Sequence, residues 1–266
     1  MTLPVYIVDA FTTKLFGGNP AAVCPLSNWL PDDVMQSLAA ENNLAETVFF
    51  VKEPGGYRIR WFTPAVEVKL CGHATLASAF VMYTELGYTA GEIVFNSLSG
   101  PLRVSRHNNG KLQLDFPASM VEPMPEIPQA IIDGLQVENV VVYKTAFDYM
   151  VIVPSQAVVE SLQPDMNIIA TLEARGVIVT AKGDDDNVDF VSRCFFPQSG
   201  INEDPVTGSA HTALTAYWAN VLGKSKMNAI QVSKRRGYLD CELAGDRVLI
   251  SGNAVMYLKG NYSIDL

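Results

Sequence analysis

The stretches CGHATLASAFVMYTELG, residues 71–87, and TGSAHTALTAYWANVLG, residues 207–223, decide the fold. At an offset of 136, five of sixteen positions from Gly72 are identical, where average usage predicts about one. Each stretch has apolar residues at steps of three and four, few charges and a closing glycine, Gly87 or Gly223. Helices this rich in small residues are typical of central helices with protein on most sides. The sequence therefore predicts two related halves, each built around one helix of about fifteen residues.

Short alternating or β-branched segments separated by turn residues flank both helices and predict strands. We therefore expect an α+β protein of two pseudo-symmetric domains, each a curved, mostly antiparallel sheet or barrel wrapped around its helix. The domains are expected at 1–117 and 129–257, with residues 118–128 of the four-proline stretch 117–128 as linker, and strand 258–266 returning to the first domain. The predicted strands are 5–8, 47–51, 57–62, 92–96, 100–105, 111–116, 140–143, 150–154, 177–180, 188–195, 238–243 and 247–257, with one short helix at 32–40.

Composition restricts the partners of the 266-residue chain. Its net charge is -9 and its one basic cluster is 234–236, so we expect no nucleic acid. No apolar run approaches about 18 residues and residues 1–11 do not resemble a secretory signal, so we expect a cytoplasmic protein without membrane contact. The four cysteines form no CxxC pair and are expected as reduced thiols. Three widely separated histidines predict no metal site.

Each long helix starts with a glycine and small residues, at Gly72-His73 and Gly208-Ser209. Free backbone N–H groups and the positive end of the helix dipole favour anions at such starts. If the halves face each other by pseudo-twofold symmetry, the two starts form a clamp for a carboxylate or phosphate between the domains. Either start alone is also explained as an ordinary helix cap.

Three further residues are candidate proton donors. Asp204 stands before Pro205 and the second helix, where it is equally explained as an N-cap. His73 beside a helix start is often simply hydrogen-bonded, and Glu46 ahead of an apolar strand is often solvated. These residues alone leave the substrate open.

Four motifs in this order resemble the PhzF family of phenazine-biosynthesis-like isomerases, and the resemblance covers both halves. It implies a diaminopimelate epimerase-like fold, which agrees with the repeat. The motifs are Val8-Asp9-Ala10-Phe11 with Phe16-Gly17-Gly18-Asn19-Pro20-Ala21-Ala22-Val23, Glu41-Asn42-Asn43-Leu44-Ala45-Glu46-Thr47, Phe62-Thr63-Pro64 through Glu67 to Cys71-Gly72-His73-Ala74-Thr75, and Glu203-Asp204-Pro205-Val206-Thr207-Gly208-Ser209-Ala210.

The resemblance also implies the chemistry: a glutamate matching Glu46 is the acid/base that moves a proton along a small carboxylate substrate bound between the domains. No cofactor is required, and a homodimer is expected. A carboxylic acid in this role works best with a pKa near neutrality, as burial can provide. Residues matching His73, Asp204 and Ser209 assist the transfer or orient the substrate; the expected substrate-binding residues are Asn19, Gly72, His73, Thr207, Gly208 and Ser209.

Alternative functions remain open on the same fold. Related epimerases use two thiols, one before each helix-start glycine; Cys71 fills the first position, but Thr207 fills the second and cannot act as a thiolate. Cys71 is then a buried residue or a pocket wall. A racemase or epimerase using Glu46 with Asp204 or His73, and a carboxylate-binding protein without catalysis, are the other hypotheses. Dihydro-hydroxyanthranilate is only one candidate substrate.

Overall fold

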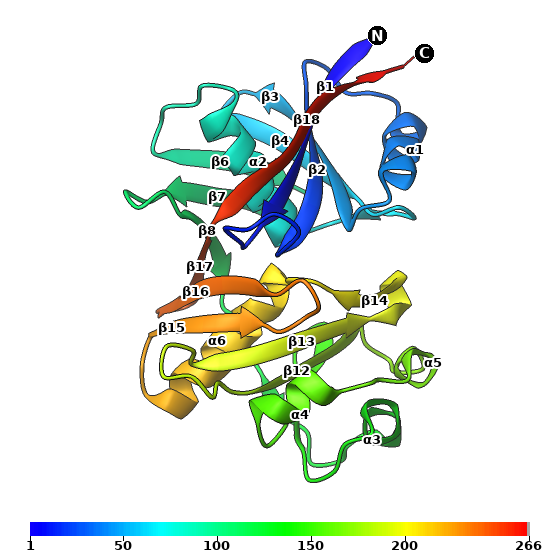
Figure 1. Cartoon of the computed structure of the whole chain (residues 1–266), viewed down its shortest axis with the longest axis vertical. Helices are drawn as coiled ribbons and strands as arrows, with labels where there is room; N and C mark the ends of the chain where they lie inside the picture. The colour runs from blue at the N-terminus through cyan, green and yellow to red at the C-terminus, as the bar shows by residue number, and fades with distance from the viewer. Residues whose placement is uncertain (265–266) are drawn as a thin grey trace. The chain divides into compact units, whose positions relative to one another are not determined.

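A computed structural model describes residues 1–264 of the chain (Figure 1). The chain divides into two compact units. Residues 1–115 and the described residues from Ser251 onward form the N-terminal unit, and Phe116–Ile250 form the C-terminal unit. The chain thus passes from the N-terminal to the C-terminal unit between residues 115 and 116, and returns between residues 250 and 251. We expected a linker at 118–128 and a second domain ending at residue 257.

Nine strands build the sheet of the N-terminal unit. Their order is β18-β1-β2-β3-β4-β6-β7-β8, with β5 also beside β4. The neighbours β2/β3 and β4/β6 are parallel, and the other neighbours in this order are antiparallel. The strands are β1 (Thr2–Ala10), β2 (Asn19–Leu26), β3 (Glu46–Glu53), β4 (Gly56–Phe62), β5 (Glu67–Val68), β6 (Glu92–Ser97), β7 (Gly100–Arg106), β8 (Leu112–Pro117) and β18 (Ala254–Ser263).

The returning strand β18 closes one side of this sheet. It pairs antiparallel with β1 from Thr2↔Ser263 to Ala10↔Ala254, and Figure 1 shows the red strand beside the dark blue one. We expected the return only over 258–266, of which residues 265 and 266 lie outside the described residues. The observed strand starts at Ala254, because a short break after β17 divides the single strand expected at 247–257.

The C-terminal unit repeats the same pairing pattern. β10, β11, β12, β13, β15 and β16 follow one another, with β11/β12 and β13/β15 parallel and the rest antiparallel. β9 pairs with β10 inside the stretch expected as a linker. The strands are β9 (Glu122–Pro123), β10 (Val141–Lys144), β11 (Asp148–Ile152), β12 (Gly176–Lys182), β13 (Phe190–Phe196), β14 (Ile201–Asp204), β15 (Lys226–Gln231), β16 (Gly237–Ala244) and β17 (Arg247–Gly252).

One long helix lies at the centre of each unit, as the repeat predicted. Ten of the thirteen residues of α2 (Gly72–Thr84) are buried, and α6 (Gly208–Leu222) is buried over nine of fifteen. Gly223 ends α6 in the left-handed conformation that the sequence predicted. α2 ends earlier than expected, at Thr84; Gly87 adopts φ +67° beyond it, where the Tyr88 N–H still bonds to the Met82 carbonyl. The predicted α+β class with two pseudo-symmetric domains is confirmed.

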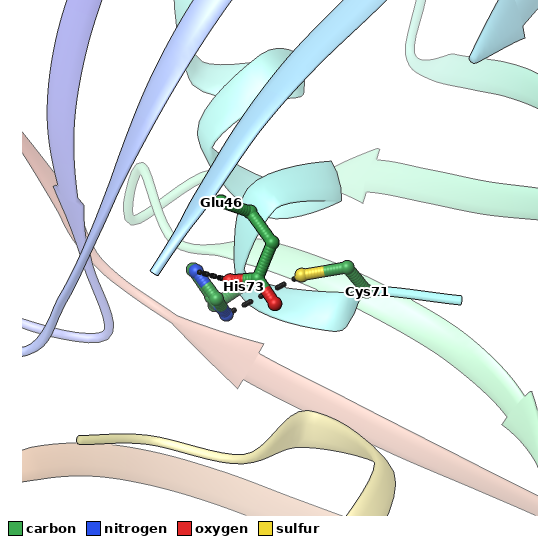
Figure 2. A group of neighbouring side chains, drawn as sticks. All are labelled: Glu46, Cys71 and His73. Atoms are coloured by element: carbon green, nitrogen blue, oxygen red, sulfur yellow. Dashed lines mark hydrogen bonds and ion pairs between the residues drawn. The ribbon is translucent and has the colours of Figure 1, made fainter. Parts of the chain in front are cut away.

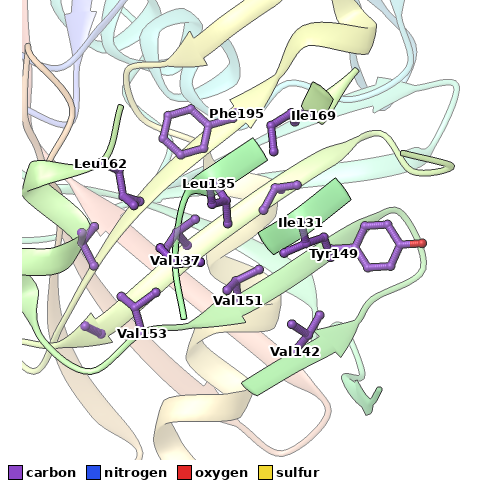
Figure 3. Close-up of a cluster of buried hydrophobic side chains, with 14 of the residues drawn as sticks. Ile131, Leu135, Val137, Val142, Tyr149, Val151, Val153, Leu162, Ile169 and Phe195 are labelled. Carbon is purple, nitrogen blue, oxygen red and sulfur yellow. The ribbon is translucent and has the colours of Figure 1, made fainter. Parts of the chain in front are cut away.

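Short helices cover the outer faces of the two sheets. In the C-terminal unit, α3 (Gln129–Leu135), α4 (Gln156–Ser161) and α5 (Met166–Ile169) enclose an apolar cluster with β11, β12 and β13 (Figure 3). In the N-terminal unit, α1 (Asp32–Asn42) packs through Met35 and Ala39 on a second cluster. A single 3-10 turn, η1 (Pro197–Ser199), precedes β14. These clusters fix the strands that carry the candidate site.

Candidate active site

Glu46 is the first residue of β3, and this strand places it in the interior of the N-terminal unit. α1 ends at Asn42, its C-cap Asn43 adopts the left-handed conformation, and the chain then turns into β3. Glu46 pairs with Ala21 of the parallel strand β2. Its residue is only 8% exposed. Glu46 is therefore buried, and the alternative considered from the sequence, that it is simply a solvated residue, is wrong.

The start of α2 presents two reactive side chains to the same place. Cys71 is the extended N-cap of α2, and its carbonyl accepts hydrogen bonds from the backbone and hydroxyl of Thr75. His73 follows in the first turn and is 3% exposed. Gly72 separates the two residues without a side chain of its own. Since α2 is buried almost all around, both side chains are held within the unit.

Glu46, Cys71 and His73 form one cluster (Figure 2). His73 Nε2 lies 3.0 Å from Glu46 Oε2, and His73 Nδ1 lies 3.5 Å from Cys71 Sγ. The Asn19 amide nitrogen, from the first residue of β2, lies 3.1 Å from the same Nδ1. The imidazole thus contacts Cys71 and Asn19 at Nδ1, and its Nε2 faces the carboxylate of the expected acid/base at ion-pair distance.

The electrostatics of the cluster favour a charged imidazole and a neutral thiol. Burial alone lowers the pKa of His73, but the neighbouring Cys71 and Glu46 outweigh it and raise the pKa well above its ordinary value. Burial, and then the negative charge of Glu46, raise the pKa of Cys71 to about 11. Cys71 therefore carries its proton at neutral pH and is a poor base, whereas Glu46 and His73 form an ion pair.

The cluster corrects one expectation from the sequence. The wide spacing of the histidines suggested that metal-binding residues do not gather locally. The fold nevertheless brings one donor atom from each of Glu46, Cys71 and His73 within 4.8 Å of one another. Residue spacing failed as a guide because β3 and α2, which are distant in sequence, meet in the interior. These three residues could hold a metal ion.

The start of α6 in the C-terminal unit carries the other predicted residues. Thr207 is the extended N-cap, and its hydroxyl donates a 2.5 Å hydrogen bond to Asp204 Oδ2. The Gln231 side chain accepts from the Thr207 N–H at 2.8 Å and donates to the Asp204 carbonyl at 2.6 Å. Ser209 follows Gly208 in the first turn of α6. Asp204, Thr207 and Gln231 thus form a buried polar network at this helix start.

Sequence reasoning missed Arg175, which lies just before β12. Its guanidinium donates to both carboxylate oxygens of the buried Asp148, at 2.8 and 2.5 Å, and to Ser209 Oγ at 3.1 Å. The ring of Phe196 lies 4.9 Å from the guanidinium carbon. No local pattern marks Arg175, since only the fold places the start of β12 beside the start of α6. A cation therefore stands beside a predicted substrate-binding residue.

His211, one turn into α6, has a different environment from His73. It is fully buried, and its Nδ1 donates to the Thr207 carbonyl at 2.8 Å. Burial lowers its pKa to about 4. His211 is therefore neutral at physiological pH and serves the packing of α6 against Phe190, whose ring centroid is 5.9 Å away.

The structure brings the predicted residues together in two groups, one in each unit. Asn19, Glu46, Gly72 and His73 gather at the start of α2, and Asp204, Thr207, Gly208 and Ser209 gather at the start of α6. Each group consists of a helix start together with side chains from adjacent strands. The expected catalytic and binding roles of these residues stay predictions.

Comparison with known proteins shows the family to which the chain belongs. Residues 8–260 match the PhzC-PhzF family, described as phenazine biosynthesis-like proteins. The chain belongs to this family. An uncharacterized isomerase of Pseudomonas aeruginosa is 48% identical over 260 residues, with 98% of each chain covered. A mouse phenazine biosynthesis-like domain-containing protein is 39% identical, covering 98% of this chain and 99% of the relative.

Solved structures agree with this family membership. A PhzF family protein of Enterococcus faecalis superposes with a TM-score of 0.94 at 45% identity, covering 99% of this chain and 100% of the other. A probable proline racemase of Agrobacterium radiobacter shares the fold alone, at 13% identity and a TM-score of 0.63, with 99% and 93% covered. As a family member with relatives named as isomerases, the chain is an isomerase. Within the described residues 1–264, no helix is long and apolar enough to span a membrane.

Proposed function

We propose that this phenazine biosynthesis-like isomerase shifts a proton along the carbon skeleton of a small carboxylate substrate, with Glu46 as the acid/base. The observation that carries the proposal is the buried Glu46 carboxylate, 3.0 Å from the imidazole of His73. A buried carboxylate in a desolvated cluster is a suitable general base, because water does not compete for the substrate proton. The resemblance of the surrounding motifs to the family supports the same role.

The proposed reaction is balanced within the substrate. Glu46 removes a proton from one carbon, and the bonding electrons delocalise into the substrate. The protonated carboxyl group then returns the proton to another carbon and restores the free enzyme. No electrons are gained or lost overall, so the proposed mechanism calls on no cofactor. The cationic His73 beside Glu46 stabilises negative charge that develops on the substrate.

The residues of the α6 start are proposed to bind the substrate carboxylate. The N–H groups at Gly208 and Ser209 lie at a helix start, where the dipole favours anions. Arg175 adds a positive charge at Ser209 Oγ, and Asp148 fixes its orientation. Asp204 and Thr207 complete the network. At the start of α2, Asn19 and Gly72 are proposed to contact substrate near His73.

An epimerase or racemase that uses Glu46 is the second candidate function. A two-thiol version is disfavoured: Cys71 has a pKa of about 11, and the equivalent N-cap of α6 is Thr207. An epimerase would therefore need Glu46 with His73 or Asp204 as the second group. A chiral analysis of the product separates this reaction from a proton shift along the skeleton.

A carboxylate-binding protein without catalysis, the third hypothesis from the sequence, is at odds with the relatives that are named as isomerases. It retains a binding group at the start of α6 and exchanges no substrate hydrogen with solvent. Saturable binding of a carboxylate, lost when Gly208 is replaced by a larger residue, without deuterium uptake by any bound compound, would favour it.

Deuterium exchange in heavy water tests the proposed function without a guess about the product. We would incubate wild type, Glu46→Gln and Glu41→Gln with aromatic precursors, amino acids and other small carboxylates, and read deuterium uptake by mass spectrometry. Glu41 is an exposed glutamate five residues away and serves as the matched control. We expect one compound to exchange with wild type and Glu41→Gln, and about 10²–10⁴-fold more slowly with Glu46→Gln. Equal exchange by Glu46→Gln would overturn the role of Glu46.

A further inference from the structure

The cluster at the start of α2 combines three kinds of metal donor. Cys71 offers a sulfur, His73 an imidazole nitrogen and Glu46 a carboxylate oxygen, and one such atom from each lies within 4.8 Å of the other two. All three residues are buried. Figure 2 shows that the carboxylate and the thiol both turn toward the imidazole, each toward a different ring nitrogen. The proton-transfer chemistry proposed above calls on Glu46 and His73 but leaves the thiol without a role.

The donor types select a class of metal ion. Mg²⁺ and Ca²⁺ prefer sets of oxygen donors, so a thiol and an imidazole disfavour them. A mixed sulfur, nitrogen and carboxylate set suits Zn²⁺ and its spectroscopic substitute Co²⁺. Three protein donors leave a fourth tetrahedral position for water or another ligand. The cluster is therefore matched to a borderline divalent ion.

Each ring nitrogen of His73 has one neighbouring donor at about the spacing of donors that share one ion, Cys71 at Nδ1 and Glu46 at Nε2. Bond lengths to Zn²⁺ of about 2.3 Å for sulfur and about 2.0 Å for nitrogen or oxygen place tetrahedral donors roughly 3.3–3.6 Å apart. The Cys71 Sγ to His73 Nδ1 distance is 3.5 Å, and the His73 Nε2 to Glu46 Oε2 distance is 3.0 Å. One ion takes one ring nitrogen, so its binding replaces either the Asn19 contact at Nδ1 or the Glu46 contact at Nε2. Donor atoms that lie within 4.8 Å of one another must then approach to the tetrahedral distances to complete the set.

A second observation supports a ligand at this place. Glu46 Oε2 and His73 Nε2 are buried, and although they lie at ion-pair distance, neither has a well-oriented hydrogen bond within the described chain. Buried polar atoms usually have such partners, and exceptions often mark a place for an ion or water. Both atoms belong to the residues that supply the metal donors.

We propose that Glu46, Cys71 and His73 bind Zn²⁺ or Co²⁺, and that the bound ion arrests the isomerase reaction. Metal binding displaces the thiol proton of Cys71 and the proton on one ring nitrogen of the cationic His73, both of which are released to solvent, and it occupies the carboxylate of Glu46. The arrest rests on the proposed role of Glu46 as acid/base, whereas metal binding itself does not. Cys71 thereby makes the site sensitive to metal without taking part in proton transfer.

Cobalt spectroscopy tests the binding apart from catalysis. We would remove metal from the full chain with a chelator, titrate it with Co²⁺, and record the near-ultraviolet sulfur-to-cobalt charge-transfer band. Wild type is expected to show the band, and Zn²⁺ to abolish it by competition. Cys71→Ser and Cys71→Ala are expected to lack it, and Glu46→Gln and His73→Gln to bind at least tenfold more weakly. Cys241→Ala is the control, because Cys241 is also buried but lies on β16.

The outcomes separate the two proposals. Circular dichroism establishes that each variant is folded, and the serine variant serves if the alanine variant is not. No band in wild type, or an unchanged band in both folded Cys71 variants, would overturn the metal site. With a substrate found by deuterium exchange, Zn²⁺ is expected to stop exchange reversibly in wild type and at least tenfold less in Cys71→Ser. A cobalt band with exchange unaffected by metal would overturn the arrest and retain the site.

Discussion

The two units share one pattern of strand pairing but carry different chemistry at matching positions. The strand registers show that Glu46 in the N-terminal unit and Gly176 in the C-terminal unit occupy equivalent positions. β3 pairs with β4 in the same register as β12 pairs with β13. The helices match in the same way, with Thr207 and Ser209 of α6 in place of Cys71 and His73 of α2. The N-terminal unit thus holds the acid, the thiol and the cationic imidazole, and the C-terminal unit holds hydroxyl groups.

Packing explains why the acid occurs only once. A Cβ atom at position 176 would lie 2.2 Å from the carbonyl oxygen of Phe195 and 2.3 Å from the Phe196 ring. No side chain fits there without movement of the backbone, so the place of Glu46 has no counterpart. Arg175, one residue earlier, instead reaches the start of α6. The repeat therefore provides the same scaffold in both units, but an acid at the Glu46 position in only one of them. This favours a reaction in which Glu46 is the single acid/base.

The largest expected contrast is between the two buried histidines of the central helices. His73→Gln removes the cation beside Glu46, so we expect the deuterium exchange rate to fall about 100-fold. His211→Gln changes a neutral packing residue, so we expect the rate of its folded fraction to stay within about threefold of wild type. Exchange rates normalised to folded protein measure both. An equal loss of exchange rate in the two variants would contradict the different roles assigned to the two histidines.

The next contrast concerns the missing side chain at position 176. Gly176→Ala forces a Cβ against the backbone of β13, so we expect the free energy of unfolding to fall by about 3 kcal/mol. Gly91→Ala is the control, because no atom lies within 4 Å of a Cβ there, and we expect a change within about 0.5 kcal/mol. Urea unfolding followed by circular dichroism measures both. Similar stability of the two variants would mean that packing does not keep the acid out of position 176.

Much of this arrangement could be predicted from the sequence. Small residues, sparse charge and closing glycines identified both central helices, since those features describe a helix with protein on every side. The strands next to them alternate and were mostly found within a few residues. β2 was missed because Pro20 and Pro25 are typical of turns, although the strand lies between β1 and β3. β15 was missed because Lys226, Asn228 and Ala229 have low strand propensity, although the strand alternates between exposed and buried residues.

The candidate site shows where prediction from the sequence stops. The motifs around Glu46, His73 and Ser209 identified these positions, but not which side chains touch. Cys71 beside His73 follows from local sequence, whereas Glu46 beside His73 requires that the start of β3 meet the start of α2. Arg175 beside Ser209 requires the matching encounter in the other unit. Such contacts depend on tertiary register, which a single sequence does not display.

Two substitutions of Arg175 distinguish the effect of its charge from that of its two-pronged contact with Asp148, and their expected effects are smaller. Arg175→Gln leaves the buried Asp148 carboxylate without its cation, so we expect the free energy of unfolding to fall by about 2 kcal/mol. Arg175→Lys keeps the charge but loses the two-pronged contact, so we expect about half that loss. Both variants should raise KM for the exchanged carboxylate more than they lower kcat. Wild-type KM in Arg175→Gln would exclude this residue from substrate binding.

The smallest effect per pH unit is the opposite pH dependence of the two histidines. The pKa of His73 is raised in the folded protein, so its protonated form stabilises the fold below the ordinary pKa of about 6.5, and this stabilisation is lost as pH rises through the raised value. The pKa of His211 is lowered to about 4, so its neutral form costs stability as pH falls below about 6.5. Each slope is at most about 1.4 kcal/mol per pH unit.

Urea unfolding of wild type, His73→Gln and His211→Gln between pH 4.5 and 9 measures these slopes. The stability of wild type minus that of His73→Gln should shrink as pH rises above about 6.5, whereas the same difference for His211→Gln should grow as pH rises toward about 6.5. Titrating groups that do not contact either histidine contribute equally to wild type and variant and cancel in each difference, whereas Glu46 and Cys71 titrate together with His73 as one coupled group. Slopes of the same sign would show that both helices hold their histidines in one charge state, and the chemical asymmetry of the two units would then rest on Glu46 alone.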